Sequence, residues 1–271
     1  MEELIKNFQK TGLTAVQATK PFGSLANRDV FGITILRKLK GNLRSEYFSI
    51  WPGHKDNIIQ VVNIDSKLQQ LVLMVKEPRR EVKHKSFRVP PKEARNIVKT
   101  KSVYEFSLFT SDAKRHFLVG VDERQLFMAQ LPRGVTTVKD AHKSLKTTSV
   151  TLAEGKVAGR TIRQGEWFFL NVTKEEKETI RTAIKDNKAV IRRKIALGAV
   201  LGGGGKPHTA DELVILPASM LEHGFSVQQR DNVFIRGKVR HADHKTVSFA
   251  EWRKVIRNAE SRAQSFGNWF D

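Results

Sequence analysis

Residues 57–75 read NIIQVVNIDSKLQQLVLMV, in which two apolar runs flank a short polar segment. Val and Ile, which are frequent in these runs, are residues that pleated strands favour. Asp65, Ser66 and Lys67 separate the runs, and Asp and Ser side chains stabilise tight turns by bonding to nearby backbone groups. The stretch therefore predicts an antiparallel β-hairpin.

Two further strand-like runs precede this hairpin, VFGITILRKL at residues 30–39 and EYFSIW at residues 46–51. Four such strands fit a small antiparallel sheet or barrel, so we assign residues 29–78 to one small antiparallel β module. Glycines and a proline interrupt the chain before it. We interpret residues 1–28 as an N-terminal arm.

The hairpin is followed by the densest positive charge in the chain, KEPRREVKHKSFRVPPKEARNIVKTK at residues 76–101. Ten Lys or Arg stand against three acids in this block, a local net charge of +7. Pro78 and the Pro90–Pro91 pair favour extended or turned backbone. We interpret residues 79–101 as a basic linker.

Residues 102–201 combine strand and helix signals and are assigned to one α+β domain. Thr137 precedes Asp140 and Thr173 precedes Glu176 by three residues, the spacing of helix N-terminal caps. Short helices are expected to begin at both threonines. The strand-like runs of this domain are SVYEFSLF (102–109), HFLVGV (116–121) and QLFMAQL (125–131), the last two forming a second predicted hairpin.

The last segment, residues 206–271, is expected to hold a β-hairpin and a helix packed on the preceding domain. NVFIRGKVRH at 232–241 and KTVSF at 245–249 supply the hairpin. Apolar residues then recur at helical spacing from Glu251 to Phe266, which predicts a C-terminal amphipathic helix. The fold class expected for the whole chain is α+β and β-rich, built of antiparallel hairpins with a few short helices.

Composition favours a polyanionic partner. The chain has 271 residues, and 48 Lys and Arg against 28 Asp and Glu give a net charge of +20. Such a charge is typical of proteins that bind phosphate backbones. No cysteine is present, which excludes disulfides and thiolate metal sites. Neither a signal sequence nor an 18-residue apolar run is visible, so a cytoplasmic location without a membrane partner is expected.

Basic residues close to aromatic ones, or alternating along a strand, are the candidates for contact with nucleic acid. Arg236, Lys238 and Arg240 alternate and would place three cations on one face of a sheet. Such a face is expected at solvent or at phosphate. The candidate nucleic-acid-binding residues are Arg79, Arg80, Lys83, Lys85, Arg88, Lys114, Arg115, Arg236, Lys238, Arg240, Arg253 and Arg257.

Histidines and acids gather between residues 208 and 244, in KPHTADEL and RHADHK. Imidazole and carboxylate together suit a divalent cation, and a metal in a basic protein would indicate a nuclease. A polar turn whose side chains bond to its own backbone is the competing interpretation, and no cofactor is assigned. The candidate metal ligands are His208, Asp211, His241, Asp243 and His244.

Three segments resemble a family of bacterial proteins of unknown function: KEPRREV (76–82), KRHFLVGVDERQLFMAQLP (114–132) and RQGEWFF (163–169). The resemblance implies a bacterial, cytoplasmic origin and brings no activity, cofactor or binding residue.

The sequence favours a non-catalytic protein that binds nucleic acid, RNA slightly over DNA, mainly through its backbone. It would act inside a bacterial ribonucleoprotein or defence assembly, together with other protein subunits. A metal-dependent nuclease is the first alternative. A basic module that binds an acidic protein is the second.

Overall fold

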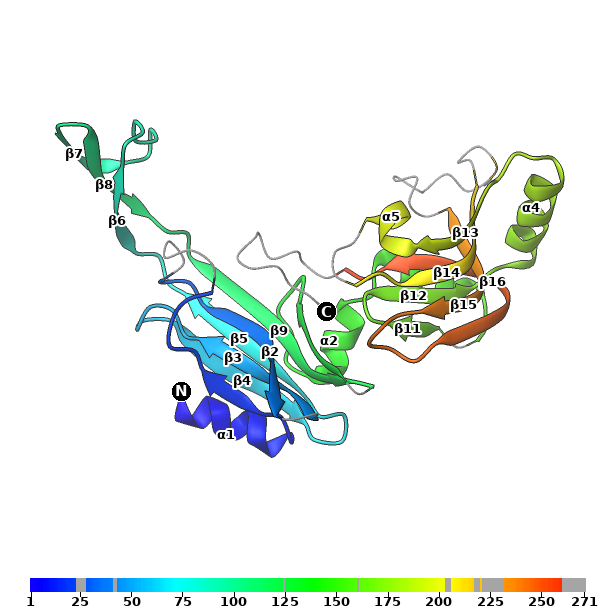
Figure 1. Ribbon diagram of the computed structural model, residues 1–271, viewed down its shortest axis with the longest axis horizontal. Coiled ribbons are helices and arrows are strands. Elements are labelled where there is room, and N and C mark those ends of the chain that lie inside the picture. Colours follow the sequence, from blue (N-terminus) through cyan, green and yellow to red (C-terminus); the bar gives the residue numbers. More distant parts are fainter. Residues whose placement is uncertain are drawn as a thin grey trace.

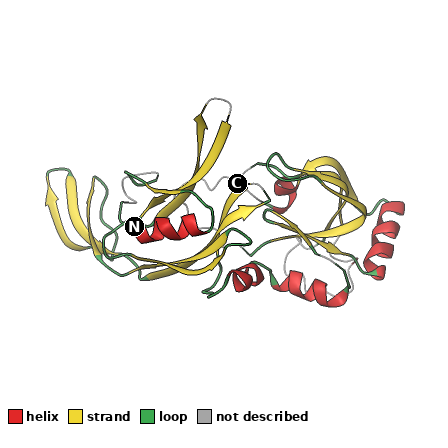
Figure 2. Cartoon of the chain, turned by 90° about the horizontal axis from the view of Figure 1, so that it is seen from below, coloured by secondary structure: helices red, strands yellow, loops and turns green. Residues whose placement is uncertain are grey.

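The computed structural model describes residues 1–22, 28–40, 43–123, 125–159, 161–202, 206–216, 220 and 232–259. Strands are the most common element among the described residues, and the few short helices lie around them (Figure 2). With one exception, all strand pairs are antiparallel. The β-rich, antiparallel fold expected from the sequence is therefore confirmed for this part of the chain.

The first predicted hairpin is β4 (Ile58–Asp65) paired with β5 (Gln70–Glu77). The second is β9 (Ala113–Asp122) paired with β10 (Gln125–Gln130). Both hairpins belong to one four-stranded sheet, because β5 also pairs with β9. A boundary near residue 78 therefore does not separate them in space.

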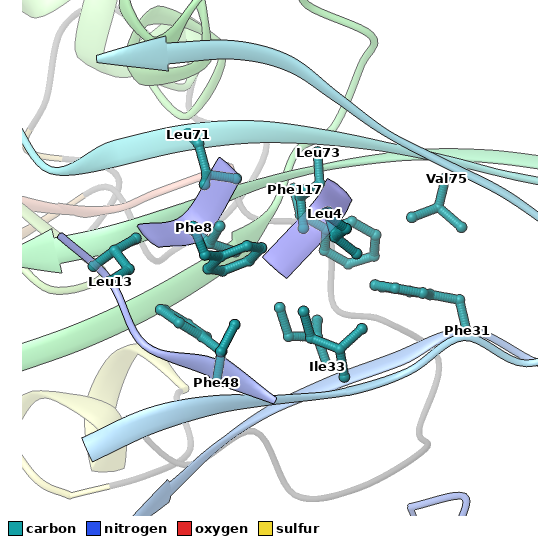
Figure 3. Packing of buried hydrophobic residues seen from close by; sticks show 13 residues of the cluster. Leu4, Phe8, Leu13, Phe31, Ile33, Phe48, Leu71, Leu73, Val75 and Phe117 are labelled. Atoms are coloured by element: carbon teal, nitrogen blue, oxygen red, sulfur yellow. The ribbon is translucent and has the colours of Figure 1, made fainter. Parts of the chain in front are cut away.

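A second sheet faces the first and consists of β1 (Ala15–Gln17), β2 (Gly32–Lys40) and β3 (Leu43–Trp51). Helix α1 (Glu2–Lys10) supplies buried Leu4 and Phe8 to the core between the sheets (Figure 3). β1 runs parallel to β3, the exception to the antiparallel pairing. Residues 1–17, expected to belong to an arm, thus contribute to this core.

The other face of the four-stranded sheet is covered by α2 (Val138–Ser144). Val138 and Ala141 pack there with Val72 and Leu118. β5 is therefore buried on both faces, with Leu71, Leu73 and Val75 in the first core and Val72 in the second. The predicted Thr137 cap is confirmed, since its side chain accepts a bond from the backbone of Asp140.

Residues 78–112 form a projection that we call the basic finger (Figure 1). Its sheet has the order β6-β8-β7, with β6 (Glu81–Ser86), β7 (Arg95–Thr100) and β8 (Val103–Phe109). β6 and β8 continue the ladder of β5 and β9, since Glu77 pairs with Ala113 and Glu81 pairs with Phe109. Residues 79–101, expected as a linker, therefore contain two strands.

The C-terminal half is built on one six-stranded sheet of order β11-β12-β16-β15-β14-β13. Helices α3 (Thr148–Lys156) and α4 (Lys174–Lys185) cover one face of this sheet, which we call its outer face, and bury Val150 and Ile180 there. Helix α5 (Leu197–Leu201) packs on the inner face. The six strands are β11 (Ile162–Gln164), β12 (Trp167–Asn171), β13 (Val190–Ala196), β14 (Thr209–Ile215), β15 (Val233–Arg240) and β16 (Val247–Arg257).

The expected C-terminal amphipathic helix is not seen among the described residues. Residues 251–257 belong to β16, and residues 260–271 lie outside the described part of the chain. β16 is buried on both faces, with Val255 in the inner core and Ile256 under α3. Adjacent apolar residues in a doubly buried strand imitate helical spacing, which explains why residues 251–257 were predicted to be helical.

Among the described residues, no helix is both long and apolar enough to cross a membrane.

Candidate functional site

Most of the basic finger is exposed, although Phe106 and Ser107 in its middle strand are buried. All six residues of β7 are exposed, and Phe87 and Val89, between β6 and β7, keep 79% and 77% of their accessible surface. The hydrophobic core clusters of the described residues contain no residue of the finger. A thin sheet with exposed apolar side chains is typical of a surface that contacts a partner.

Cations and aromatic rings alternate on the finger. The guanidinium groups of Arg79 and Arg95 lie 4.7 and 5.1 Å from the centre of the Phe109 ring, and Lys99 lies 5.2 Å from that of Tyr104. The candidates from the sequence that are exposed here are Arg79, Lys83, Lys85 and Arg88. Lys85 forms an ion pair with Glu105, but at a position open to solvent. The finger can therefore offer both phosphate contacts and stacking faces.

Three of the predicted binding residues are partly buried and bonded to other side chains of the fold. Arg115 forms an ion pair of 2.5 Å with buried Glu77. Arg80 donates to the side chain of Asn57, and Arg257 donates twice to Glu166. Arg253, a fourth candidate, is half-buried above the Phe249 ring. These cations stabilise the fold, whereas Lys114, their neighbour on β9, is exposed.

The alternating row on β15 lies at solvent, as the sequence predicts. Arg236, Lys238 and Arg240 are exposed. Acids on β14 neutralise part of this charge, because Arg236 pairs with Glu212 and Arg240 with Asp211. The bond from Arg240 and a bond from the Lys238 backbone lower the pKa of Asp211, which keeps it charged.

A basic edge was missed in the sequence. Arg192, Arg193 and Lys194 are consecutive and exposed on β13, the edge strand of the six-stranded sheet. The run of three cations is visible in the sequence, but no local pattern shows that its strand lies at the edge of a sheet. Exposed Val190 and Ile191 in the same strand place it at the surface.

Three histidines meet at one end of the C-terminal sheet. His208 precedes β14, His241 follows β15, and His244 lies in the turn before β16. Because Thr209 pairs with Arg240, the antiparallel ladder brings the first two histidines next to each other. One ring nitrogen from each histidine lies within 4.8 Å of the other two.

His208 is the most deeply buried member, with 3% of its surface exposed. Its ring stacks on His241 at 4.0 Å between ring centres, and the edge of Trp167 lies beside it. Burial, and then the two neighbouring histidines, lower the pKa of His208 to about 3, so its ring is neutral at neutral pH. A neutral imidazole is the form that binds metal ions.

The two acids predicted with the histidines have other partners. Asp211 accepts a hydrogen bond from Arg240. Among the described residues, no carboxylate lies close enough to the three histidines to share an ion with them. Asp243 forms an ion pair of 2.5 Å with Lys206. Burial raises the pKa of Asp243, but the bond and charge of Lys206 and the charge of Arg37 outweigh this and lower it. The five-residue ligand set is thus reduced to three histidines.

A cavity of about 410 Å³ lies beside the histidines, between the two halves of the chain. The N-terminal half lines it with apolar residues of β2 and β10, among them Leu36 and Phe127, and also with polar residues such as Arg37 and Glu46. The C-terminal half contributes polar residues, including Arg163, Glu166 and Lys206, together with His241 and His244. Gly165, which turns the chain between β11 and β12 at φ +55°, also lines the cavity.

Sequence reasoning found the three histidines and missed the residues around them. Arg37, Glu46, Gln125 and Arg163 reach the cavity from parts of the chain far apart in sequence. No local pattern distinguishes such residues, because the cavity exists only once the two halves have packed.

Comparison with models of protein families found no match, and neither did searches of curated proteins and of solved structures.

Proposed function

We propose that the protein binds single-stranded nucleic acid, RNA slightly preferred over DNA, through the basic finger. The observation that carries the proposal is the combination of exposed cations and exposed rings on a sheet that projects from the body. Phosphates would contact Lys83 and Arg88, and Phe87 would stack on a base. Such contacts read the backbone and shape rather than the sequence.

The role we assign is non-catalytic, within a bacterial ribonucleoprotein or defence assembly. Other protein subunits would meet the remaining surface. The row Arg236, Lys238 and Arg240 and the β13 edge offer secondary contacts, weakened on β15 by the pairing with Asp211 and Glu212. These positions therefore contribute less to affinity than the finger does.

The test compares two triple variants of the full chain. K83A/R88A/K92A removes three exposed charges from the finger, and K174A/R181A/K185A removes three exposed charges from α4. Binding to a labelled 20-nucleotide single-stranded RNA is measured by fluorescence anisotropy at several salt concentrations. The finger variant is expected to lower the slope of log K against log salt by about 2, since each phosphate contact contributes about 0.7 on single strands.

The α4 variant should keep most of the affinity. Equal losses in both variants would show that net charge alone drives binding and would contradict the finger. Competition with single-stranded DNA and with duplexes of the same length measures the preference for RNA. If the unaltered protein binds none of these polymers at low salt, the proposal is wrong, and an acidic protein partner becomes the better hypothesis.

A metal-dependent nuclease is the second candidate, favoured by the meeting of the three histidines beside the cavity. The bound RNA, incubated with Zn²⁺ or Mn²⁺, would then be degraded, and H241A would abolish the degradation. RNA that stays intact under these conditions supports the non-catalytic role.

A further inference from the structure

We propose that His208, His241 and His244 form a binding site for one Zn²⁺ ion or a similar transition-metal ion. The fourth coordination position of the ion would face the cavity between the two halves of the chain.

The donor set selects the class of ion. Three imidazoles lie within 4.8 Å of one another, and no carboxylate joins the group among the described residues. Nitrogen ligands suit Zn²⁺, Cu²⁺ and Ni²⁺, whereas Mg²⁺ and Ca²⁺ require oxygen. Three histidines with an open fourth position are a common zinc arrangement.

An unsatisfied nitrogen points to a missing ligand. Nε2 of His208 is buried and meets no hydrogen-bond partner among the described residues. A buried polar atom without a partner is energetically costly. A metal ion bound at this atom would remove that cost.

Gly165 leaves the space that an ion and its water would need. A Cβ at this position would lie 3.3 Å from Nε2 of His208 and 3.2 Å from Nε2 of His244. The backbone there has φ +55°, a conformation that glycine adopts without strain. Gly165, like His241 and His244, lines the cavity, so an ion in this space is reachable from it.

Binding would require a modest rearrangement. Nitrogens around a tetrahedral Zn²⁺ stand about 3.3 Å apart, given bonds of about 2.0–2.1 Å. His241 accepts a bond from the Asp243 backbone at Nδ1 (3.1 Å), while its Nε2 lies 3.2 Å from the Lys206 carbonyl. The ion would replace the Asp243 contact at Nδ1, because Nε2–H can then keep donating to the Lys206 carbonyl. That kept bond orients the ring, as hydrogen bonds around metal-bound histidines do.

The test is a titration of the tag-free full chain, stripped with EDTA and transferred to metal-free buffer. Isothermal titration calorimetry with Zn²⁺ should show one site per chain, and Co²⁺ should give the visible absorption bands of a tetrahedral nitrogen site. H244A changes the least buried ring of the three and should weaken binding about a hundredfold. H54A, which alters a histidine of the β3–β4 loop, should leave binding unchanged.

G165A should also weaken Zn²⁺ binding, because its methyl group would occupy the proposed ion position. Circular dichroism and thermal unfolding separate loss of the site from loss of the fold. The proposal is overturned if Zn²⁺ does not bind at one per chain, or if H244A binds it as tightly as the unaltered chain. No nucleic acid is present in the titration, so this proposal and the proposed function fail separately.

Discussion

At the scale of single residues, the distinction that matters is between cations held by the fold and cations free for a partner. Arg80, Arg115 and Arg257 look in the sequence like any other basic residue. Their partners Asn57, Glu77 and Glu166 lie 23, 38 and 91 residues away along the chain. Local reasoning found the charge and could not find these partners, because long-range packing creates them.

The Glu77–Arg115 pair gives a prediction about stability. The Glu77 carboxylate accepts a hydrogen bond of 2.7 Å from the backbone N–H of Phe31. E77Q keeps an oxygen for this bond but leaves Arg115 without a countercharge. We expect a loss of about 2 kcal/mol in the free energy of unfolding, below the range for fully buried pairs because Arg115 is 22% exposed. Urea denaturation measures it.

The double variant E77Q/R115M serves as the control for charge. If the unpaired guanidinium causes the loss, removal of that group should recover part of it. A double variant that is even less stable than E77Q would show instead that packing of the Arg115 side chain, and not its unpaired charge, determines the stability.

At the scale of elements, the hairpins were predictable and the strands buried on both faces were not. The strands of the pairs β4–β5 and β9–β10 are joined by short turns. Residues close together in the sequence are therefore enough to predict each pair. The second part of β16, residues 251–257, was predicted as a helix, because its apolar residues face two different cores. The parallel pairing of β1 with β3 has no local signal, since it depends on α1 crossing the core.

Helix α1 provides the element-scale prediction. Phe8 is fully buried, and its ring lies 5.3 Å from that of Phe48 on the opposing sheet. F8A should lower the free energy of unfolding by about 3–5 kcal/mol, the usual cost of removing a buried ring. F8L, which keeps most of the volume, should cost much less, and urea denaturation compares them. Equal stability of F8A and the unaltered chain would mean that α1 is not part of the core in solution.

At the scale of the whole molecule, the body should fold without the basic finger. No finger residue belongs to the core clusters of the described residues, although the ladder of β5 and β9 continues into it. Replacing residues 82–108 by Asn-Gly should keep the melting temperature within a few degrees. Thermal unfolding followed by circular dichroism tests this. A large drop would show that the finger supports the sheet, and loss of RNA binding without such a drop would locate binding in the finger.

The position of β16 has a consequence for protein synthesis. It follows every other described strand in the chain, yet it lies between β12 and β15 in the middle of the six-stranded sheet. During translation, β11 and β12 emerge first and β13 to β15 later, but they cannot join until residues 247–257 have left the ribosome. Until then, each part presents an unpaired edge on which other chains can align. The C-terminal half should therefore depend on chaperones until β16 is inserted, whereas the N-terminal sheets can close while translation continues.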